Sequence, residues 1–282
     1  MIIGEQLRVE IQRNVAAALA EDIGTGDLTA HLIPDSVQAR GRVITRENAI
    51  LCGSAWFDAA FAALQPNALV TWHAADGDRL EAGQPICDII ATARSLLTAE
   101  RTGLNFLQLL SATATLTRNY VDAVAGTRAS IVDTRKTLPG LRLAQKYAVL
   151  VGGGVNHRIG LYDGILIKEN HIISAGGVRE VLGTARRIAS GNAFIEIEVE
   201  SLAQLREALD AGARMVLLDN MNLDQMREAV QINGGRAELE ASGGVSLDMV
   251  REIAETGVDR ISIGGLTKNV RAIDLSLRHI EE

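Results

Sequence analysis

The stretch DTRKTLPGLRLAQKYAVLVGGGVNHRIGLYDGILIKENH, residues 133–171, decides the fold and the place of the site. One apolar run ends at Val132 and is followed by Asp133. A second apolar run, residues 165–167, is followed by Lys168. Short apolar runs that stop at charged residues are typical of buried parallel strands with polar ends. Three of the chain's four lysines lie in this window. We therefore expect two strand ends that direct cations at a ligand with several negative charges.

Composition and charge restrict the class of protein. The 282 residues are 47% hydrophobic and 22% charged, which is ordinary for one large or two smaller globular domains. The net charge of -7 disfavours general binding to nucleic acid, which needs a basic surface. No apolar run reaches the length of about 20 residues that spans a bilayer. Clustered cations in an acidic protein indicate a small anionic ligand.

The N-terminal residues and the cysteines indicate a cytoplasmic protein. Residues 1–22 lack the basic region, apolar block and cleavage site of a signal peptide. Cys52 and Cys87 are too few for a disulfide scaffold and have no metal-binding spacing. We expect both to be inert core thiols in a reducing compartment.

Residues 1–107 are expected to form an N-terminal α/β domain with a mixed sheet. The pattern predicts an amphipathic helix over 5–20, and then β-rich sequence over 37–92 with one helix inside it. Residues 94–124 are helical in period, with an interruption expected at 111–115.

From Gly126 onward the pattern predicts alternating strands and helices. The last four strands should begin at 194, 215, 237 and 260, a spacing that fits one strand, one helix and two short loops. No GxGxxG or Walker pattern follows the first strand, which favours a barrel over an open nucleotide-binding sheet. Residues 108–266 are therefore expected to form an incomplete βα (TIM-like) barrel. The predicted strands are 130–133, 164–168, 194–200, 215–219, 237–242 and 260–265, and the predicted helices are 139–150, 176–190, 201–211, 222–232 and 246–256.

Every predicted barrel strand ends in charged, polar or glycine residues. The active site of a βα barrel lies at these carboxyl ends, and six such ends together are hard to attribute to surface loops alone. The candidate residues are Asp133, Thr134, Arg135, Lys136, Lys168, Glu198, Asp219, Asn220, Ser242, Gly243, Gly244, Ile263, Gly264 and Gly265.

The cations also have structural explanations. Arg135 and Lys136 would otherwise form a solvated pair at a helix start, although their place after a strand favours ligand contact. Lys168 follows apolar residues and needs a partner, for which Glu198 is suitable. His157 is either a hydrogen-bonded loop residue or part of the site, and its sequence context does not decide between them.

Glu198 and Asp219 end neighbouring strands and suit sugar hydroxyls, or Mg²⁺ held through water. Glu196 and Glu200 lie on the same side of the strand as Glu198 by the period of two, so any of the three glutamates remains a candidate ligand. A structural hydrogen bond between strands is the alternative for one of these acids.

The last two strands end in glycine pairs, at 243–244 and 264–265. Glycines there expose backbone N–H groups to an anion, and phosphate sites of βα barrels are commonly built from this pair of loops. A tight βα turn would also use glycine, but the repetition on adjacent strands favours phosphate.

The chain resembles the quinolinate phosphoribosyltransferase family, also called carboxylating nicotinate-nucleotide pyrophosphorylase, over nearly its full length. Long, ordered motifs carry the resemblance: EDIGTGDLT at 21–29, ERTGLN at 100–105, DTRKTLPGLR at 133–142, GGGVNHRIGLYDGILIKENH at 152–171, IEIEVE at 195–200, VLLDN at 216–220, EASGG at 240–244 and SIGGLT at 262–267. It implies an enzyme that joins quinolinate to phosphoribosyl pyrophosphate, with nicotinate mononucleotide, pyrophosphate and CO₂ as products on the de novo route to NAD.

The resemblance also implies roles for single residues. Those that would hold the quinolinate carboxylates are Arg101, Arg135, His157, Arg158 and Lys168. Those that would face ribose and pyrophosphate, with Mg²⁺ held mostly by substrate and water, are Lys136, Glu198 and Asp219. Those that would line the 5′-phosphate site are Ser242, Gly243, Gly244, Ile263, Gly264 and Gly265, while Thr134 would join the substrate contacts. The family often has alanine for Gly265 and histidine for Lys268, and neither departure threatens the assignment.

Two further features follow from the resemblance. A C-terminal helix over 267–282 would return to the N-terminal domain. The protein would form a homodimer in which Arg101 enters the partner's site.

Two other functions fit parts of the pattern. A Schiff-base aldolase would use Lys168 at its strand end as the nucleophile. A ligand-binding or transport-associated paralogue would keep the fold and the phosphate loops but bind another molecule, although the joint presence of Arg135, His157, Arg158 and Lys168 argues against it.

Overall fold

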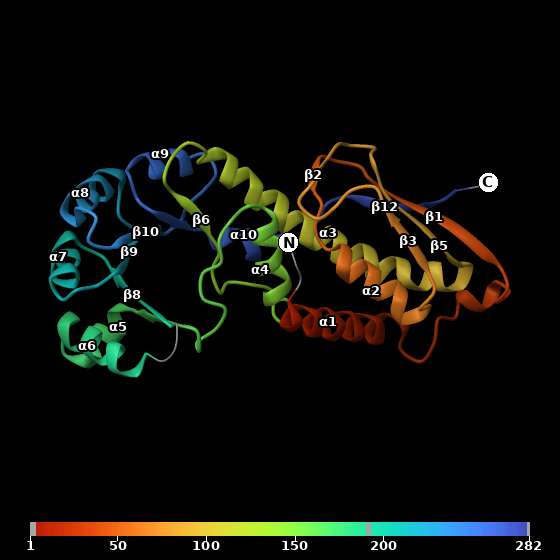
Figure 1. Ribbon diagram of the computed structural model, residues 1–282, viewed down its shortest axis with the longest axis horizontal. Helices are drawn as coiled ribbons and strands as arrows, with labels where there is room; N and C mark the ends of the chain where they lie inside the picture. The colour runs from red at the N-terminus through yellow and green to blue at the C-terminus, as the bar shows by residue number, and fades with distance from the viewer. Residues whose placement is uncertain (1–3, 190–192, 281–282) are drawn as a thin grey trace. The chain divides into compact units, whose positions relative to one another are not determined.

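A computed structural model describes residues 4–189 and 193–280 of the chain (Figure 1). The chain divides into two compact units, each built from separate segments. The first unit comprises Met1–Arg118, Leu138–Gly153 and Thr267–Glu282, and the second comprises Asn119–Thr137 and Gly154–Leu266. The boundary predicted after residue 107 lies inside one continuous helix, α3 (Ala93–Ala123).

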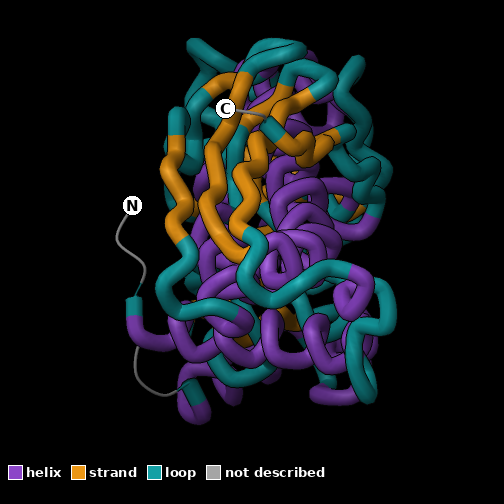
Figure 2. The backbone as a smooth tube through the Cα atoms, turned by 90° about the vertical axis from the view of Figure 1, so that its right-hand side faces the viewer, coloured by secondary structure: helices purple, strands orange, loops and turns teal. Residues whose placement is uncertain are grey.

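The first unit combines a sheet with helices, as the prediction of an α/β domain implied, and the strands of this sheet pair antiparallel. The strand order is β12-β1-β5-β3, and the long strands are seen side by side in Figure 2. Its strands are β1 (Gln38–Thr45), β3 (Leu69–Trp72), β5 (Pro85–Thr92) and β12 (Leu275–His279), and β2 (Ala49–Ile50) pairs with β4 (Arg79–Leu80) as a separate ribbon. Inward residues of β1 and β5, including Val43, Ile86 and Ile89, join one buried cluster with Phe57 and Leu104.

Helices of the first unit bury one face each. Ile11, Val15 and Leu19 are spaced by four residues on α1 (Glu5–Ile23) and pack in a second cluster with Trp56. The remaining elements are η1 (Ala30–Leu32), α2 (Ser54–Leu64), α4 (Arg142–Val151) and α10 (Gly265–Lys268), which begins in the second unit.

The interruption expected at 111–115 is wrong, because α3 is continuous there. The hydroxyl of Thr117 donates to the carbonyl of Thr113 at 2.8 Å, and that of Ser111 donates to the carbonyl of Cys52 at 3.1 Å. The hydroxyl of Thr117 thus finds its acceptor within the helix and that of Ser111 finds one outside it, while both residues keep the helical conformation.

The helix predicted over 267–282 is also wrong. After the short α10 the chain forms strand β12, which pairs antiparallel with β1 from Gly41↔His279 to Thr45↔Leu275. Leu275 is buried in the sheet's core, and Leu277 packs against it. Alternation of apolar and polar residues over 275–279 is the signal for this strand, whereas the helix was expected from the family resemblance alone.

The second unit is a six-stranded parallel sheet, as in an incomplete barrel, with order β6-β11-β10-β9-β8-β7. Each predicted strand is confirmed to within a few residues. The strands are β6 (Ser130–Val132), β7 (Gly164–Ile167), β8 (Phe194–Val199), β9 (Met215–Asp219), β10 (Glu238–Ser242) and β11 (Arg260–Ser262). The helices are α5 (Glu169–Ala175), α6 (Val178–Ile188), α7 (Leu202–Asp210), α8 (Leu223–Asn233) and α9 (Val250–Glu255).

Helices α6 to α9 lie along one side of this sheet, which leaves its other side to the site (Figure 1). The short helix α5 was not predicted. It begins directly after Lys168, whose backbone N–H donates to Nδ1 of His171 at 2.9 Å. Among the described residues, no helix combines the length and the apolar character needed to cross a membrane.

Candidate active site

A cavity of about 280 Å³ opens at the carboxyl ends of the six parallel strands. Its lining residues come from every strand of the sheet or from the loop after it, as the topology of parallel strands requires. They are Thr134, Arg135, Lys136, His157, Arg158, Leu166, Lys168, Glu198, Leu217, Glu240, Ser242 and Ser262. Eight of the predicted site residues therefore share one cavity.

The cavity is cationic although the whole chain is acidic. Arg135, Lys136, Arg158 and Lys168 all line it. Burial lowers the pKa of the Arg158 guanidinium, and the positive charge of Arg135 lowers it further. Arginine remains charged in proteins, so this repulsion is a cost that an anionic ligand would relieve.

Lys168 and Glu198 form an ion pair across the cavity wall, with Nζ and Oε2 3.1 Å apart. The side chain of Lys168 is 48% exposed, so it can exchange this partner for a ligand. Burial raises the pKa of Glu198, Lys168 opposes the shift, and the nearby Asp219 adds to it. Glu198 is thus the cavity-lining member of the three candidate glutamates, while Glu196 is fully buried and Glu200 lies exposed beyond the end of β8.

Asp219 ends β9 beside Ser242 of β10 in the sheet register but does not line the cavity itself. Asn220 donates a hydrogen bond from Nδ2 to Oδ2 of Asp219 at 2.9 Å, which orients that carboxylate. The backbone of Asn220 has φ of 53°, a left-handed conformation that asparagine tolerates better than most residues.

The glycine pairs lie at the cavity's rim, beyond its lining residues. Gly243 has φ of 109°, and an added Cβ there would collide with the side-chain amide of Asn220. An added Cβ at Gly264 would meet Cδ of Lys136 at 2.9 Å. Glycine therefore suits the backbone conformation at the first position, and at the second it leaves room for the flexible side chain of Lys136. Gly244, Ile263 and Gly265 follow the same two strands.

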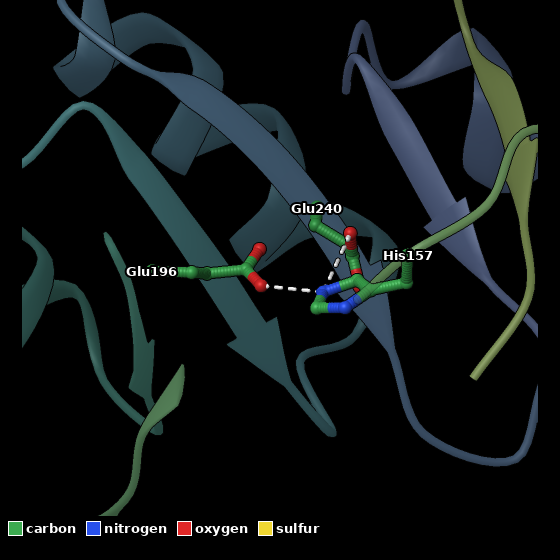
Figure 3. Close-up of side chains that lie close together, drawn as sticks. All are labelled: His157, Glu196 and Glu240. Atoms are coloured by element: carbon green, nitrogen blue, oxygen red, sulfur yellow. Dashed lines mark hydrogen bonds and ion pairs between the residues drawn. The ribbon is translucent and has the colours of Figure 1, made fainter. Parts of the chain in front are cut away.

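A buried cluster lies on one side of the cavity, formed by His157, Glu196 and Glu240 (Figure 3). Nε2 of His157 lies 2.7 Å from Oε2 of Glu196 and 3.9 Å from Oε2 of Glu240. Burial, followed by the charge of Glu196, raises the pKa of Glu240 to about 7. Arg260 partly balances this charge, with Nε 3.2 Å from Oε2 of Glu240.

Two family models match almost the whole chain. The description "Quinolinate phosphoribosyl transferase, N-terminal domain" fits residues 27–111, and "Quinolinate phosphoribosyl transferase, C-terminal domain" fits residues 113–278.

The chain belongs to the quinolinate phosphoribosyltransferase family.

Relatives of known name agree with this family. The chain is 44% identical to a nicotinate-nucleotide pyrophosphorylase [carboxylating] of Mycobacterium leprae, covering 93% of this chain and 95% of that one. It is 42% identical to a probable enzyme of the same name from Bacillus subtilis, covering 91% and 89%. The structure of the nicotinate-nucleotide pyrophosphorylase from Francisella tularensis is similar with a TM-score of 0.94 and 45% identity, covering 97% of both chains.

Within this quinolinate phosphoribosyltransferase fold, some residues at the site were not predicted. Glu240, Leu166, Leu217 and Ser262 line the cavity without having been predicted, whereas Asp133, a predicted candidate, accepts the backbone N–H of His157 at 2.8 Å. The period of two was a usable signal for two of them: Glu240 shares a strand face with Ser242, and Leu217 shares one with Asp219. Arg101 belongs to the first unit and the cavity to the second, so its role stays a prediction.

Proposed function

We propose that this protein joins quinolinate to phosphoribosyl pyrophosphate and releases nicotinate mononucleotide, pyrophosphate and CO₂, as a step in the synthesis of NAD. The observation that carries the proposal is the cavity in which Arg135, Lys136, Arg158 and Lys168 converge beside strands that end in glycine pairs. Four cations exceed what one carboxylate needs, and they suit a dicarboxylate next to a pyrophosphate. The family membership supports the same reaction.

The carboxylates of quinolinate would bind Arg135, Arg158 and Lys168. Arginine's planar fork matches a carboxylate in two hydrogen bonds, and Lys168 would exchange Glu198 for the substrate. The pyridine nitrogen is a weak nucleophile, so its placement against the ribose carbon is the main contribution of these contacts.

The phosphoribosyl group would lie between the acids and the glycine loops. Ser242, Gly243, Gly244, Ile263, Gly264 and Gly265 would surround the 5′-phosphate, for which exposed backbone N–H groups are suitable donors. Lys136, held against Gly264, would neutralise charge that develops on the departing pyrophosphate. Glu198 and Asp219 would bind the ribose hydroxyls.

Mg²⁺ is the expected cofactor, and the residues present fit it. Burial raises the pKa of Glu198, and the negative charge of the nearby Asp219 raises it further. A hard cation held through water and substrate oxygens would relieve this repulsion. When bound, Mg²⁺ supplies charge neutralisation for the pyrophosphate group.

After the pyridine nitrogen bonds to the ribose carbon, the ring carries a positive charge. That charge stabilises the electron pair left on the ring carbon when the adjacent carboxylate departs as CO₂, and this carbon then takes up a proton from water to give nicotinate mononucleotide. The cavity therefore has to hold the ring in place, and no covalent intermediate with the protein is needed.

A homodimer in the cytoplasm is part of the proposal, with Arg101 of one protomer completing the site of its partner. Arg101 is exposed on α3, in the sequence ERTGLN through which the chain resembles its family. An exposed arginine among leucines on a helix is available to a second chain.

A Schiff-base function is less well supported. Lys168 pairs with Glu198 at 3.1 Å, and this contact stabilises the charged ammonium rather than the neutral amine that attacks a carbonyl. Borohydride trapping of a carbonyl substrate on Lys168 would favour that function.

The assay that tests the proposal supplies quinolinate labelled in its 2-carboxylate, phosphoribosyl pyrophosphate and Mg²⁺, and measures labelled CO₂ and nicotinate mononucleotide together. We expect both products in equal amounts. Nicotinate offered in place of quinolinate should give little product, because it lacks the second carboxylate. Equal turnover of the two acids, or no product from quinolinate, contradicts the proposal.

A further inference from the structure

The residue His157 is held through its backbone and through both ring nitrogens, and Figure 3 shows its ring beside Glu196 and Glu240. Its backbone N–H donates to Oδ1 of Asp133 at 2.8 Å, and its ring nitrogen Nδ1 accepts the backbone N–H of Arg158 at 2.8 Å. Its other ring nitrogen, Nε2, lies 2.7 Å from Oε2 of Glu196. The edge of the ring of Phe194 also packs with the imidazole, the two centroids being 5.3 Å apart.

These contacts fix the position of the proton on the ring. A nitrogen that accepts a hydrogen bond cannot also carry a proton at that site, so Nδ1 presents its lone pair to Arg158. The proton therefore lies on Nε2 and is donated to the carboxylate of Glu196. Glu196 thus favours the neutral tautomer of His157 with its proton on Nε2. Only this neutral tautomer can accept the backbone N–H of Arg158 at Nδ1.

We propose that Glu196 is a positioning residue for quinolinate, acting through the tautomer of His157 on Arg158. The inference rests on the proposed function for the identity of the ligand. Glu196 is fully buried and does not line the cavity, whereas Arg158 does. Its effect on a substrate therefore passes through the imidazole.

The contacts of His157 with Glu196 and Arg158 control the position of the Arg158 guanidinium. Its Nη1 donates to the carbonyl of Gly164 at 3.1 Å, which is a single fixed point for a long side chain. The backbone of Arg158 is fixed by the imidazole of His157. If the ring turned or changed tautomer, the lone pair at Nδ1 would be lost and the start of the Arg158 side chain would move. A small displacement of such a group is enough to weaken a two-point contact with a carboxylate.

Glu240 provides the contrast. It is also buried beside His157, but its nearest oxygen lies 3.9 Å from Nε2, beyond hydrogen-bond distance, and Arg260 is its closer partner.

The side chains of His157, Glu196 and Glu240 have ligand atoms within 4.8 Å of one another, which is also compatible with a divalent cation. A cation would need the lone pair of Nε2, and the hydrogen bond from Arg158 to Nδ1 leaves a proton there instead. Replacing Glu196 should therefore matter for the tautomer, and replacing Glu240 should not.

The test compares the full-length wild type with Glu196→Gln and Glu240→Gln. Protein labelled with ¹⁵N in its five histidines reports which ring nitrogen is protonated, and His157→Gln identifies the signal of His157. We expect Nε2–H in the wild type and in Glu240→Gln, and a mixture of tautomers in Glu196→Gln. Calorimetric titration with quinolinate and, separately, with phosphoribosyl pyrophosphate then measures the two dissociation constants.

Glu196→Gln should weaken quinolinate binding by about tenfold, the size of one charge-assisted hydrogen bond, and should change phosphoribosyl pyrophosphate binding by less than about twofold. A wild-type ring protonated on Nδ1, an unchanged quinolinate constant, or an equal loss for both substrates overturns the proposal. Mn²⁺ that binds to the substrate-free wild type but to neither glutamine variant would also overturn the proposal. If the wild type binds no quinolinate, the proposed function fails, and the tautomer measurement still decides whether Glu196 sets the ring.

Discussion

The side chain of Lys136 lies across the backbone of Gly264. A Cβ atom added at Gly264 would meet Cδ of Lys136 at 2.9 Å and Oγ1 of Thr134 at 3.6 Å. The two residues come from the ends of β6 and β11, which are neighbours in the sheet. Because residue 264 has no side chain, the side chain of Lys136 can lie against its backbone. We assign this lysine to the departing pyrophosphate.

The first prediction concerns this contact. Gly264→Ala should displace Lys136 and lower kcat by about tenfold to a hundredfold, because a misplacement of about 1 Å is costly in a positioned group. Gly264 does not have a positive φ, so alanine adds no backbone strain and thermal unfolding should change little. Gly183→Ala in α6 is the control, since the nearest atom to its added Cβ is 3.9 Å away. Equal kcat values for Gly264→Ala and the wild type would show that Lys136 does not depend on this contact.

The second prediction separates the roles of two cavity cations. Arg158→Ala should mainly weaken quinolinate binding, and Lys136→Ala should mainly slow the chemical step. Loss of one charge-assisted contact is worth about 1.5–3 kcal/mol, so each defect is measurable. Binding constants from titration and single-turnover rates distinguish the two. If both variants lose only quinolinate affinity, this division of roles is wrong.

The third prediction concerns Arg101 and the proposed dimer. Arg101→Ala and Lys136→Ala are each expected to lose most of their activity, and mixing them after dissociation should restore part of it. In a mixed dimer with sites completed by the partner, one site carries both changes and the other carries none. Random pairing makes about half of the dimers mixed, so roughly a quarter of all sites should be intact.

Subunit exchange has to be verified in the same sample, for example with two affinity tags. If exchange is complete and activity stays near zero, every site retains one change. Arg101 would then act within its own protomer or outside the site.

The fourth prediction is a pH dependence of stability. Glu240 has a pKa of about 7 in the folded protein, raised by burial and by Glu196 from an ordinary value of 4.5. Between these two values the folded protein retains a proton that the unfolded chain releases. The free energy of unfolding should therefore fall as pH rises from about 4.5 to about 7 and level off above that.

Glu240→Gln should lose this dependence, and the difference from the wild type should grow to an order of a few kcal/mol between pH 5 and pH 8. Urea unfolding at the two pH values measures it. Glu238→Gln, on the exposed start of the same strand, is the control and should follow the wild type. A wild type that gains stability relative to Glu240→Gln over this range would contradict the assignment.

The fold of the second unit could be predicted because its strands are short apolar runs at regular spacing, as β8 and β9 show. That information is local in the sequence. Strand β12 could not be predicted in the same way, since five residues are held as a strand by pairing with β1, more than 220 residues earlier. Helix α3 was predicted with a break at 111–115, and the carbonyl of Cys52 that accepts the hydroxyl of Ser111 is visible only in three dimensions.

The site shows the same division. Cations and glycines at strand ends, such as Lys136 and Gly264, were predictable from parallel topology alone. The partnership of Glu196 and His157 was not, because it joins β8 to the segment between α4 and β7, and no pattern in the sequence shows which residue of that segment meets β8.

Strand β12 also has a consequence for the order in which the protein is made. The N-terminal unit is the first to be synthesised, yet one edge of its sheet, β1, lacks its partner until residues 275–279 have been translated. The nascent chain must therefore carry an open strand edge while the entire second unit is being made. We expect this open edge to make ribosome-bound intermediates more prone to aggregation than the folded protein, and chaperones that shield strand edges would act before residues 275–279 emerge.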